Sequence, residues 1–467
     1  MLGRTRRIHF VGIGGIGMSG IAELLANLGY LVSGSDAKRS EVTARLEKAF
    51  GVAVFEGHAA EHVGDADVVV YSSAVRPSNP EVVAARQRGI PVIPRAEMLA
   101  ELMRLRFSIA VAGSHGKTST TSMIALVLER AGLDPTAVIG GRLSVFGSNA
   151  RLGQGEYLVA EADESDRSFL MLWPSIAVVT NIDDEHMESY GSLANLQQAF
   201  VDFSNKVPFY GAAVACADDP NLRAILPRIT RRLVTYGLDN PDAHVHGTDV
   251  ELGPFGGRCA VHRRTLDEVK TLGQLELAVP GRHNLQNALA AVAVGEHVGL
   301  EFSVIAGALS GFHGAERRFE RHGEVGGVLI VDDYGHHPTE IAAVMAAARA
   351  TLNRRLVVAF QPHRYSRTAH LMEAFGPSLR GADVVVLTDI YAAGEEPIAG
   401  VTVERLADSI GSRAGCPVHL ARTLDDVVAK LLTIVRPGDA VITLGAGSIG
   451  TLPRRLMAAL EHRGTRT

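Results

Sequence analysis

The sequence lacks several features that would assign it to common classes of protein. Its three cysteines, Cys216, Cys259 and Cys416, lie far apart, so neither a disulfide framework nor the CxxC spacing of a zinc site is present. No run of 18 apolar residues occurs, and glycines interrupt the apolar stretch near the N-terminus, so we expect neither a membrane-spanning helix nor a signal peptide. The formal net charge is −5 with no long run of like charge, which argues against binding to nucleic acid or to an anionic membrane. These absences favour a protein of the reducing cytoplasm that acts on small molecules.

Lysine is also scarce, and this makes each lysine informative. Lysine and arginine together number 46, of which six are lysines. An arginine in a motif is therefore weak evidence for function, whereas a lysine in a motif is stronger evidence. Apolar sequence is abundant, because 46% of the residues are hydrophobic and 21% are charged. At ~150 residues per domain, the chain is long enough for about three domains with packed cores.

Short apolar runs alternate with helical patterns along the whole chain. This alternation predicts βαβ units, and hence an α/β fold of three domains that each contain a largely parallel sheet. We expect domain boundaries near residues 105 and 320, which gives domains over 1–105, 106–320 and 321–467. The first and third domains are predicted to be Rossmann-like.

The strongest local motif lies between an apolar strand and a long helix. It reads Gly113-Ser114-His115-Gly116-Lys117-Thr118. The backbone N–H groups of such a loop and the helix dipole can hold a triphosphate, Lys117 can reach the outer phosphates, and the Thr118 hydroxyl can bind Mg²⁺. The full Walker pattern has glycine where this chain has Val111, so the loop is a shortened variant. We therefore predict a P-loop ATPase-like central domain; the alternative is a glycine-rich turn that binds no phosphate.

A second glycine-rich loop, GIGGIG over residues 12–17, follows the first apolar strand and opens a helix. This GxGxxG pattern, with Asp36 at the end of the next strand, is typical of a dinucleotide-binding Rossmann domain. The glycines allow close approach to a diphosphate, and Asp36 can accept a hydrogen bond from a ribose hydroxyl. Because a nicotinamide cofactor and a UDP-linked sugar both carry these groups, both ligands stay open here, as does a role in strand–helix packing alone.

Polar residues gather where several predicted strands end, the edge at which open α/β sheets bind ligands. The segments are EADESD over 161–166, TNIDDEH over 180–186, DDYGHHP over 332–338 and QPHRYSR over 361–367. Carboxylates at such an edge suit Mg²⁺. Imidazole suits Mg²⁺ less well, so His186 is either a ligand or a capping or solvent-facing residue. Arg318, near the second boundary, either reaches a phosphate or forms a solvated pair with Arg317.

Together these motifs resemble the Mur ligase family over essentially the whole chain. The matching segments, in order, are HFVGIGGIGMSGIAE, AGSHGKTSTT, AEADESDRSF, TNIDDEHMESY, GRHNLQNALAA, RRFE, VDDYGHHPTE, QPHRYSRT and TLGAGSIG. DYGHHP with HRYSRT is similar to the branch of the family that adds alanine. The relative that reattaches recovered murein tripeptides also carries paired histidines and is the alternative within the family.

The resemblance implies an ATP-dependent ligase of cytoplasmic peptidoglycan precursor synthesis. Such an enzyme joins L-alanine to the lactyl carboxylate of UDP-N-acetylmuramate through an acyl phosphate. The resemblance also implies ATP and Mg²⁺ as cofactors. We expect two small-molecule substrates, no nucleic-acid or membrane partner, and a monomer or a weak homodimer.

The resemblance further implies roles for individual residues. Those that match catalytic positions are Lys117, Glu161 and His186, and those that match magnesium ligands are Thr118, Glu161 and His186. Those that match ATP-binding positions are Gly113, Ser114, His115, Gly116, Lys117, Thr118, Ser119, Asn284, Arg318 and Asp333. The UDP group would be held by Gly14, Gly15, Gly17, Asp36, His58, Ser72 and Ser73, and the amino acid by Tyr334, His336, Arg364 and Arg367. Other family members use a carbamylated lysine, but Lys206 lies at a shifted position and receives no role.

Two functions of other classes stand as alternatives. An NAD-dependent dehydrogenase would use the 12–17 loop but leave the 113–118 loop idle. A P-loop ATPase that couples hydrolysis to motion or to partner binding would use the second loop without a ligation step. Sustained ADP release that requires both proposed substrates would separate a ligase from either.

Overall fold

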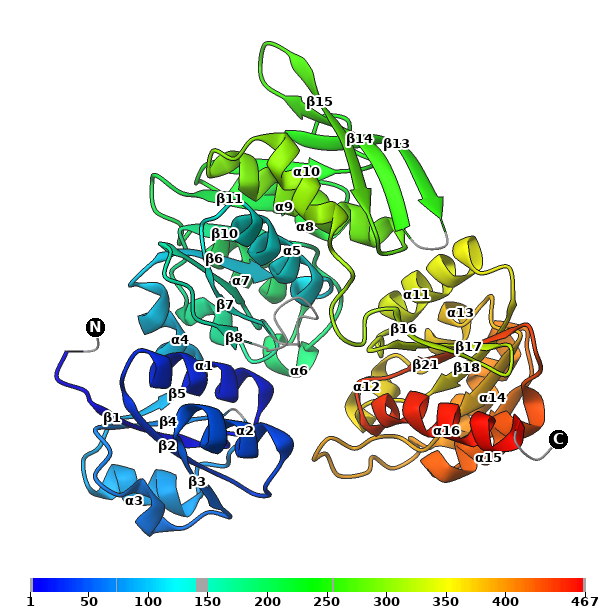
Figure 1. The fold of residues 1–467 in the computed structure, drawn as a ribbon, viewed down its shortest axis with the longest axis horizontal. Helices are drawn as coiled ribbons and strands as arrows, with labels where there is room; N and C mark the ends of the chain where they lie inside the picture. Colours follow the sequence, from blue (N-terminus) through cyan, green and yellow to red (C-terminus); the bar gives the residue numbers. More distant parts are fainter. Residues whose placement is uncertain (1–2, 73, 140–149, 254–255, 465–467) are drawn as a thin grey trace. The chain divides into compact units, whose positions relative to one another are not determined.

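A computed structural model describes residues 3–72, 74–139, 150–253 and 256–464, and it has the predicted α/β fold with three largely parallel sheets (Figure 1). The chain forms two compact units. The first comprises residues 1–249, 259–275 and 286–312, and the second comprises 250–258, 276–285 and 313–467. Within the described ranges, no helix combines the length and the apolar character needed to cross a bilayer.

The N-terminal sheet has five parallel strands in the order β3-β2-β1-β4-β5. The strands are β1 (Arg7–Val11), β2 (Leu31–Asp36), β3 (Ala53–Glu56), β4 (Val68–Tyr71) and β5 (Val92–Pro94). The helices between them are α1 (Ile16–Asn27), α2 (Glu41–Phe50), η1 (Ala60–Val63), α3 (Pro80–Gln87) and α4 (Arg95–Met103). The strand order reverses beside β1, so the loop at 12–17 lies at the switch point where doubly wound sheets bind ligands. This confirms the Rossmann-like prediction for the first domain.

The central sheet has ten strands in the order β15-β14-β13-β12-β11-β10-β6-β9-β7-β8. The strands are β6 (Phe107–Ala112), β7 (Thr136–Val138), β8 (Ala150–Arg151), β9 (Tyr157–Glu161), β10 (Ile176–Val179), β11 (Ala212–Cys216), β12 (Leu233–Gly237), β13 (Val245–Gly253), β14 (Gly256–Arg264) and β15 (Val269–Leu277). β6 pairs in parallel with β9 and β10, and every residue of β10 and β11 is buried. Strands that are buried on both faces have continuous apolar sequences, and this is why apolar runs predicted these strands.

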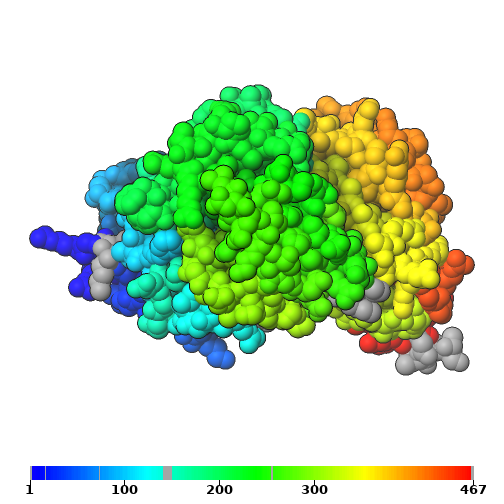
Figure 2. Space-filling model, turned by 90° about the horizontal axis from the view of Figure 1, so that it is seen from above, coloured from blue at the N-terminus to red at the C-terminus, as the bar shows by residue number. Residues whose placement is uncertain are grey.

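Helices accompany the parallel part of the central sheet. They are α5 (Lys117–Arg130), η2 (Ser168–Met171), α6 (Met187–Tyr190), α7 (Leu193–Ser204), α8 (Pro220–Arg223), η3 (Leu226–Arg228), α9 (Arg282–His297) and α10 (Phe302–Ser310). Residues 119–128 of α5 are all buried, so this helix is fixed firmly where it follows β6. Residues of the second half of the central domain, green in the space-filling view, form much of the face seen there (Figure 2), and Leu266 between β14 and β15 is fully exposed.

The C-terminal sheet has six strands in the order β16-β17-β21-β18-β19-β20, and only the edge strand β16 is antiparallel to its neighbour. The strands are β16 (Glu320–Val325), β17 (Val328–Asp333), β18 (Arg355–Phe360), β19 (Val384–Leu387), β20 (Val418–Leu420) and β21 (Asp439–Leu444). The helices are α11 (Pro338–Thr351), α12 (Tyr365–His370), α13 (Phe375–Ser378), α14 (Val403–Ala414), α15 (Leu424–Ile434), η4 (Ser448–Thr451) and α16 (Leu452–Gly464). Leu329 and Val331 of β17 belong to one core cluster, whereas Val328 and Ile330 belong to another. Apolar side chains therefore cover both faces of this sheet, because successive residues of a strand point to opposite faces.

Candidate active site

The loop between β6 and α5 is built so that glycine is required at its first position. Gly113 has a φ of +132°, and an added Cβ would lie 2.0 Å from the Thr180 Oγ1 atom. The Thr180 hydroxyl donates to the carbonyl of His115 at 2.6 Å, and the His115 N–H donates to Asn181 Oδ1 at 2.8 Å. Residues that follow β10 therefore hold the loop in place. The first N–H groups of an α-helix have no acceptor within that helix, and the P-loop prediction places a phosphate at those of α5.

Lys117 begins α5, and its ammonium group turns back over the loop. Its Nζ donates to the carbonyls of Gly113 at 2.6 Å and Ser114 at 3.2 Å, and to Glu164 Oε1 at 2.9 Å. Burial alone would lower the pKa of Lys117, but the nearby carboxylates, foremost Glu164, outweigh it and raise that pKa. The lysine therefore stays charged, with its ammonium group held between the loop carbonyls and Glu164.

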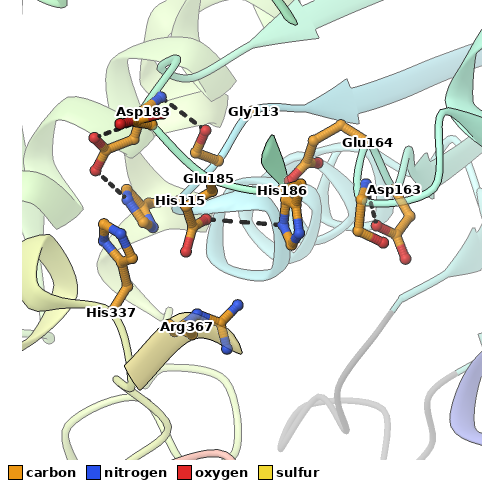
Figure 3. Close-up of polar contacts among 12 residues, drawn as sticks. Gly113, His115, Asp163, Glu164, Asp183, Glu185, His186, His337 and Arg367 are labelled. Atoms are coloured by element: carbon orange, nitrogen blue, oxygen red, sulfur yellow. Dashed lines mark hydrogen bonds and ion pairs between the residues drawn. The ribbon is translucent and has the colours of Figure 1, made fainter. Parts of the chain in front are cut away.

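A buried acidic cluster faces Lys117. Glu164 is only 1% exposed, and its Oε1 lies 3.7 Å from His186 Nε2. Glu185 Oε2 lies 3.9 Å from the same nitrogen (Figure 3). Burial raises the pKa of Glu164 to about 7, and the charge of Asp163 adds to the rise while Lys117 opposes it. The site thus holds more negative charge than one lysine can neutralise.

Glu164, Glu185 and His186 are the cluster best arranged for a cation. One ligand atom of each lies within 4.8 Å of the others. Among the described residues, Glu164 Oε2 is buried and has no hydrogen-bond partner. A buried carboxylate oxygen in that state favours a metal ligand role, because an unsatisfied charged oxygen is costly. These donors fit Mg²⁺, which prefers carboxylate oxygens.

Of the residues assigned to the metal from the sequence, His186 belongs to this cluster. Thr118 is half-buried in the first turn of α5. Glu161 is the last residue of β9 and pairs with Val111 of β6, two residues before the loop. Sequence reasoning placed Glu161 with His186 and assigned no role to Glu164 or Glu185, which the structure brings next to that histidine. The 161–166 segment contains four acids, and nothing in its linear pattern indicates which of them meets Lys117.

His115, predicted to touch ATP, is held by a carboxylate. Its Nε2 lies 2.8 Å from Asp183 Oδ2, and the Asp183 N–H donates to Ser114 Oγ at 2.8 Å (Figure 3). These bonds connect the loop to the segment after β10. Ser119 is buried in α5 behind the loop.

The N-terminal loop is equally constrained. Asp36 Oδ2 accepts the N–H of Gly14 at 2.8 Å, and a Cβ on Gly14 would come within 2.9 Å of that oxygen. We expect Asp36 to bind a ribose; what the structure shows is that Asp36 fixes the loop through the Gly14 N–H. Gly15 is the N-cap of α1, and Ser72 follows β4, where its Oγ accepts from the Ala74 N–H at 3.4 Å. Ser73, predicted to hold the UDP group, lies outside the described residues.

Arg95 connects the two loops within the first unit. A Cβ added to Gly17 would lie 2.3 Å from Arg95 Nη1, so the guanidinium packs directly on the glycine. Its Nη2 lies 3.7 Å from Asp163 Oδ2, beside the acidic cluster. The sequence did not predict a role for Arg95, because one arginine in an arginine-rich chain does not indicate a functional site. His58, also predicted for the UDP group, bonds through Nδ1 to Ser35 and Glu81.

Several predicted residues of the second unit also come together. Asp333 ends β17 and accepts from the N–H groups of Phe319 at 2.7 Å and Gly335 at 2.6 Å. Burial raises the pKa of Asp333 to about 6, while the charge of Arg318 opposes the rise. The guanidinium of Arg318 lies over the Tyr334 ring, 5.2 Å from its centroid. Residues predicted to contact ATP and a residue predicted to contact the amino acid are therefore neighbours at one edge of the sheet.

The histidines of the second unit form a continuation of this group. The His336 ring lies 5.5 Å from the Tyr334 ring and 5.4 Å from the His363 ring, centroid to centroid. Arg367 Nη1 lies 3.3 Å from His363 Nδ1. Burial lowers the pKa of His336 to about 3 and that of His363 to about 4, with nearby arginines contributing to both shifts. His363 was not assigned from the sequence, although its segment was singled out.

Three further residues considered from the sequence make the following contacts. Arg364 Nη1 lies 3.8 Å from Glu395 Oε1. The buried Asn284 donates through Nδ2 to the carbonyl of Pro280 at 2.7 Å. Lys206 donates to the Leu170 carbonyl and lies 4.8 Å from the centroid of the Trp173 ring.

Comparison with known proteins identifies the family. The chain matches the family models for the Mur ligase family catalytic domain over residues 7–107, the Mur ligase middle domain over 111–295 and the Mur ligase glutamate ligase domain over 317–447. A UDP-N-acetylmuramate–L-alanine ligase of Geobacter sp. (strain M21) is 54% identical over 99% of this chain and 100% of that protein.

Solved structures of similar proteins support the same family. A UDP-N-acetylmuramate-alanine ligase from Thermotoga maritima is 30% identical, with a TM-score of 0.81 over 99% of this chain and 100% of that one. A murein peptide ligase from Psychrobacter arcticus is 25% identical, with a TM-score of 0.72 over 98% and 99% of the two chains. With a lysine-bearing phosphate loop beside a buried acidic cluster, and with family models that match all three sheets in order, the chain belongs to the Mur ligase family.

Proposed function

We propose that this chain joins L-alanine to the lactyl carboxylate of UDP-N-acetylmuramate with the use of ATP. The observation that carries the proposal is Arg95, which packs on Gly17 of one glycine-rich loop and faces Asp163 beside the other. A UDP substrate on the first loop and a triphosphate on the second would thus lie next to each other. The names of the relatives at 54% and 30% identity support alanine as the amino acid.

The proposed reaction needs activation of the carboxylate, because oxide is too poor a leaving group for direct attack by an amine. Transfer of the γ-phosphoryl group to the lactyl carboxylate converts that oxygen into a phosphate leaving group. Lys117 stabilises charge on the transferring phosphoryl group, and the loop N–H groups orient the triphosphate. The amine of alanine then attacks the carbonyl carbon, and phosphate departs.

We assign the metal to Glu164, Glu185 and His186, with Glu161 and Thr118 beside them. When bound, Mg²⁺ would supply positive charge that stabilises the charge of the triphosphate. The carboxylates would then leave Lys117 free to turn from Glu164 toward the triphosphate. In the second unit we assign Arg318, Asp333 and Asn284 to ATP, and Tyr334, His336, Arg364 and Arg367 to alanine.

We also keep as proposals the boundaries near 105 and 320 and the monomer or weak homodimer. The ranges of the three family models support the boundaries. Because the reaction uses ATP and a UDP-linked sugar, we place it in the cytoplasm.

The test is an ADP-release assay in which one component is omitted at a time. We expect sustained ADP release only with UDP-N-acetylmuramate and L-alanine together. A murein tripeptide in place of alanine tests the recycling alternative within the family. Turnover without either substrate would instead indicate an ATPase of another kind. Thermal stabilisation by NAD but not by UDP-N-acetylmuramate would favour the dehydrogenase.

A further inference from the structure

A buried hydrogen-bond network lies beneath the proposed UDP site. Its centre is Glu81, in the first turn of α3, which is 0% exposed. Glu81 Oε2 lies 2.6 Å from His9 Nε2, and Oε1 lies 2.9 Å from His58 Nδ1. The Ser35 hydroxyl donates to the same carboxylate at 2.8 Å. Three segments that belong to β1, β2 and the loop after β3 thus converge on one acid.

The network determines which nitrogen of His58 carries a proton. Hydrogen bonds from His9, Ser35 and His58 outweigh the effect of burial and lower the pKa of Glu81, so its oxygens only accept. Ser35 gives its single proton to Glu81, so its oxygen can only accept from His58 Nδ1, which lies 3.0 Å away. Both partners of Nδ1 are acceptors. The proton of a neutral His58 therefore lies on Nδ1, and Nε2 offers a lone pair.

His58 is the member of the network that reaches solvent. Its side chain is 25% exposed, whereas those of His9 and Glu81 are 0% exposed. It follows β3 at the carboxyl edge of the sheet. Its partner Ser35 directly precedes Asp36, which binds the Gly14 N–H of the glycine-rich loop. His62, the third nearby histidine, has its Nδ1 3.9 Å from Glu81 Oε1 and stacks on Phe55.

We propose that Glu81 is a positioning residue for the UDP substrate, because it holds His58 with Nε2 as a hydrogen-bond acceptor at the edge of the proposed site. The partner of Nε2 is a hydrogen-bond donor of uridine diphosphate, either the ring N–H or a ribose hydroxyl. This inference rests on the proposed function for the identity of the ligand. It adds a buried residue that touches no substrate and acts only through His58.

The proton position can be measured on the wild-type protein. Selective ¹⁵N-histidine labelling, with His58 assigned from the signal lost in His58→Gln, should show a protonated Nδ1 and an unprotonated Nε2. A neutral ring with its proton on Nε2 would overturn the proposal. So would a doubly protonated ring. This measurement does not depend on the folding of any Glu81 variant.

The consequence for binding is tested with Glu81→Gln. A glutamine amide can donate to Nδ1 and release the proton to Nε2. We expect the Kd for UDP, measured by calorimetry, to rise roughly tenfold, the size of one lost hydrogen bond. The KM for UDP-N-acetylmuramate should rise in parallel, while kcat and the Kd for ATP stay unchanged. Unchanged UDP affinity, or equal loss of UDP and ATP affinity, would overturn the proposal.

The matched control is Glu23→Gln. Glu23 is another buried acid of this domain, and it pairs with Arg45 at 2.7 Å between α1 and α2. Glu23→Gln should leave the Kd for UDP unchanged. If Glu23→Gln weakened UDP binding as much as Glu81→Gln does, the Glu81 effect would be general destabilisation, and the proposal would be wrong. Two analogues identify which donor meets His58: UDP methylated at the ring nitrogen lacks the ring N–H, and 2′-deoxy-UDP lacks one ribose hydroxyl. The analogue that lacks the donor should bind weakly to the wild type, and its affinity should fall no further in Glu81→Gln. A wild-type protein that does not bind UDP at all would instead refute the proposed function.

Discussion

Replacement of Lys117 by alanine should lower both activity and stability, and the two losses have separable causes. The Lys117 ammonium lies 2.9 Å from Glu164 Oε1, and Glu164 is 1% exposed. Alanine at position 117 leaves this carboxylate buried without its cation. Loss of one partner of a buried ion pair costs ~3–5 kcal/mol. Because burial already raises the pKa of Glu164 to about 7, the carboxyl can take up a proton and relieve part of this cost.

We therefore expect Lys117→Ala to cost ~2–3 kcal/mol of unfolding free energy, or roughly 4–12 °C of melting temperature. The double variant Lys117→Ala/Glu164→Gln should recover most of that stability, because a neutral amide needs no cation. Both variants should lose at least ~10²-fold in kcat, since Lys117 acts on the transferring phosphoryl group. Calorimetry of the nucleotide-free protein and the ADP-release assay measure the two effects in parallel.

Lys270→Ala is the matched control. Lys270 is exposed on β15, so its loss should change stability by less than ~0.5 kcal/mol and leave turnover intact. A double variant as unstable as the single one would refute the argument that an uncompensated charge causes the loss. A folded Lys117→Ala protein with wild-type turnover would refute the phosphate role of the loop.

Three further predictions test other parts of the structure. Gly113→Ala should weaken ATP binding in calorimetry and cost ~1 kcal/mol or more of stability, because its Cβ would meet Thr180 Oγ1 at 2.0 Å at a φ of +132°; Gly132→Ala, at a φ of +77° with open space around it, should leave ATP affinity unchanged. The pKa of His336 is lowered to about 3 by burial, with Arg367 and His363 contributing, whereas an unfolded histidine titrates near ~6.5. The unfolded state thus binds the proton more readily, so stability falls as the pH drops below ~6.5, and His336→Gln should flatten that fall in urea unfolding between pH 7 and 5; an unchanged slope would contradict the burial argument. Finally, ¹⁸O in the lactyl carboxylate should appear as one labelled oxygen in the released phosphate by mass spectrometry, and unlabelled phosphate formed with amide product would exclude the acyl-phosphate route.

Local patterns along the chain are enough to predict the fold class. Alternation of apolar runs with helical patterns is local, and a buried strand such as β10 must be apolar throughout whatever lies beside it. The two glycine-rich loops could also be recognised in the sequence. At Gly113, for example, the backbone conformation excludes any side chain, so glycine is required there. Their positions between a strand and a helix followed from the same local patterns.

Which side chains meet depends on how the strands and loops pack, and local patterns do not reveal it. Glu164 rather than another acid of its segment contacts Lys117, because the chain turns after β9 and brings that side chain under the loop. Arg95 and Glu81 gave no signal in the sequence, since each contacts a partner at least 23 residues away. Contacts between segments distant in the sequence depend on strand order and on the direction of each side chain. Neither is encoded in the local periodicity from which the fold class was predicted.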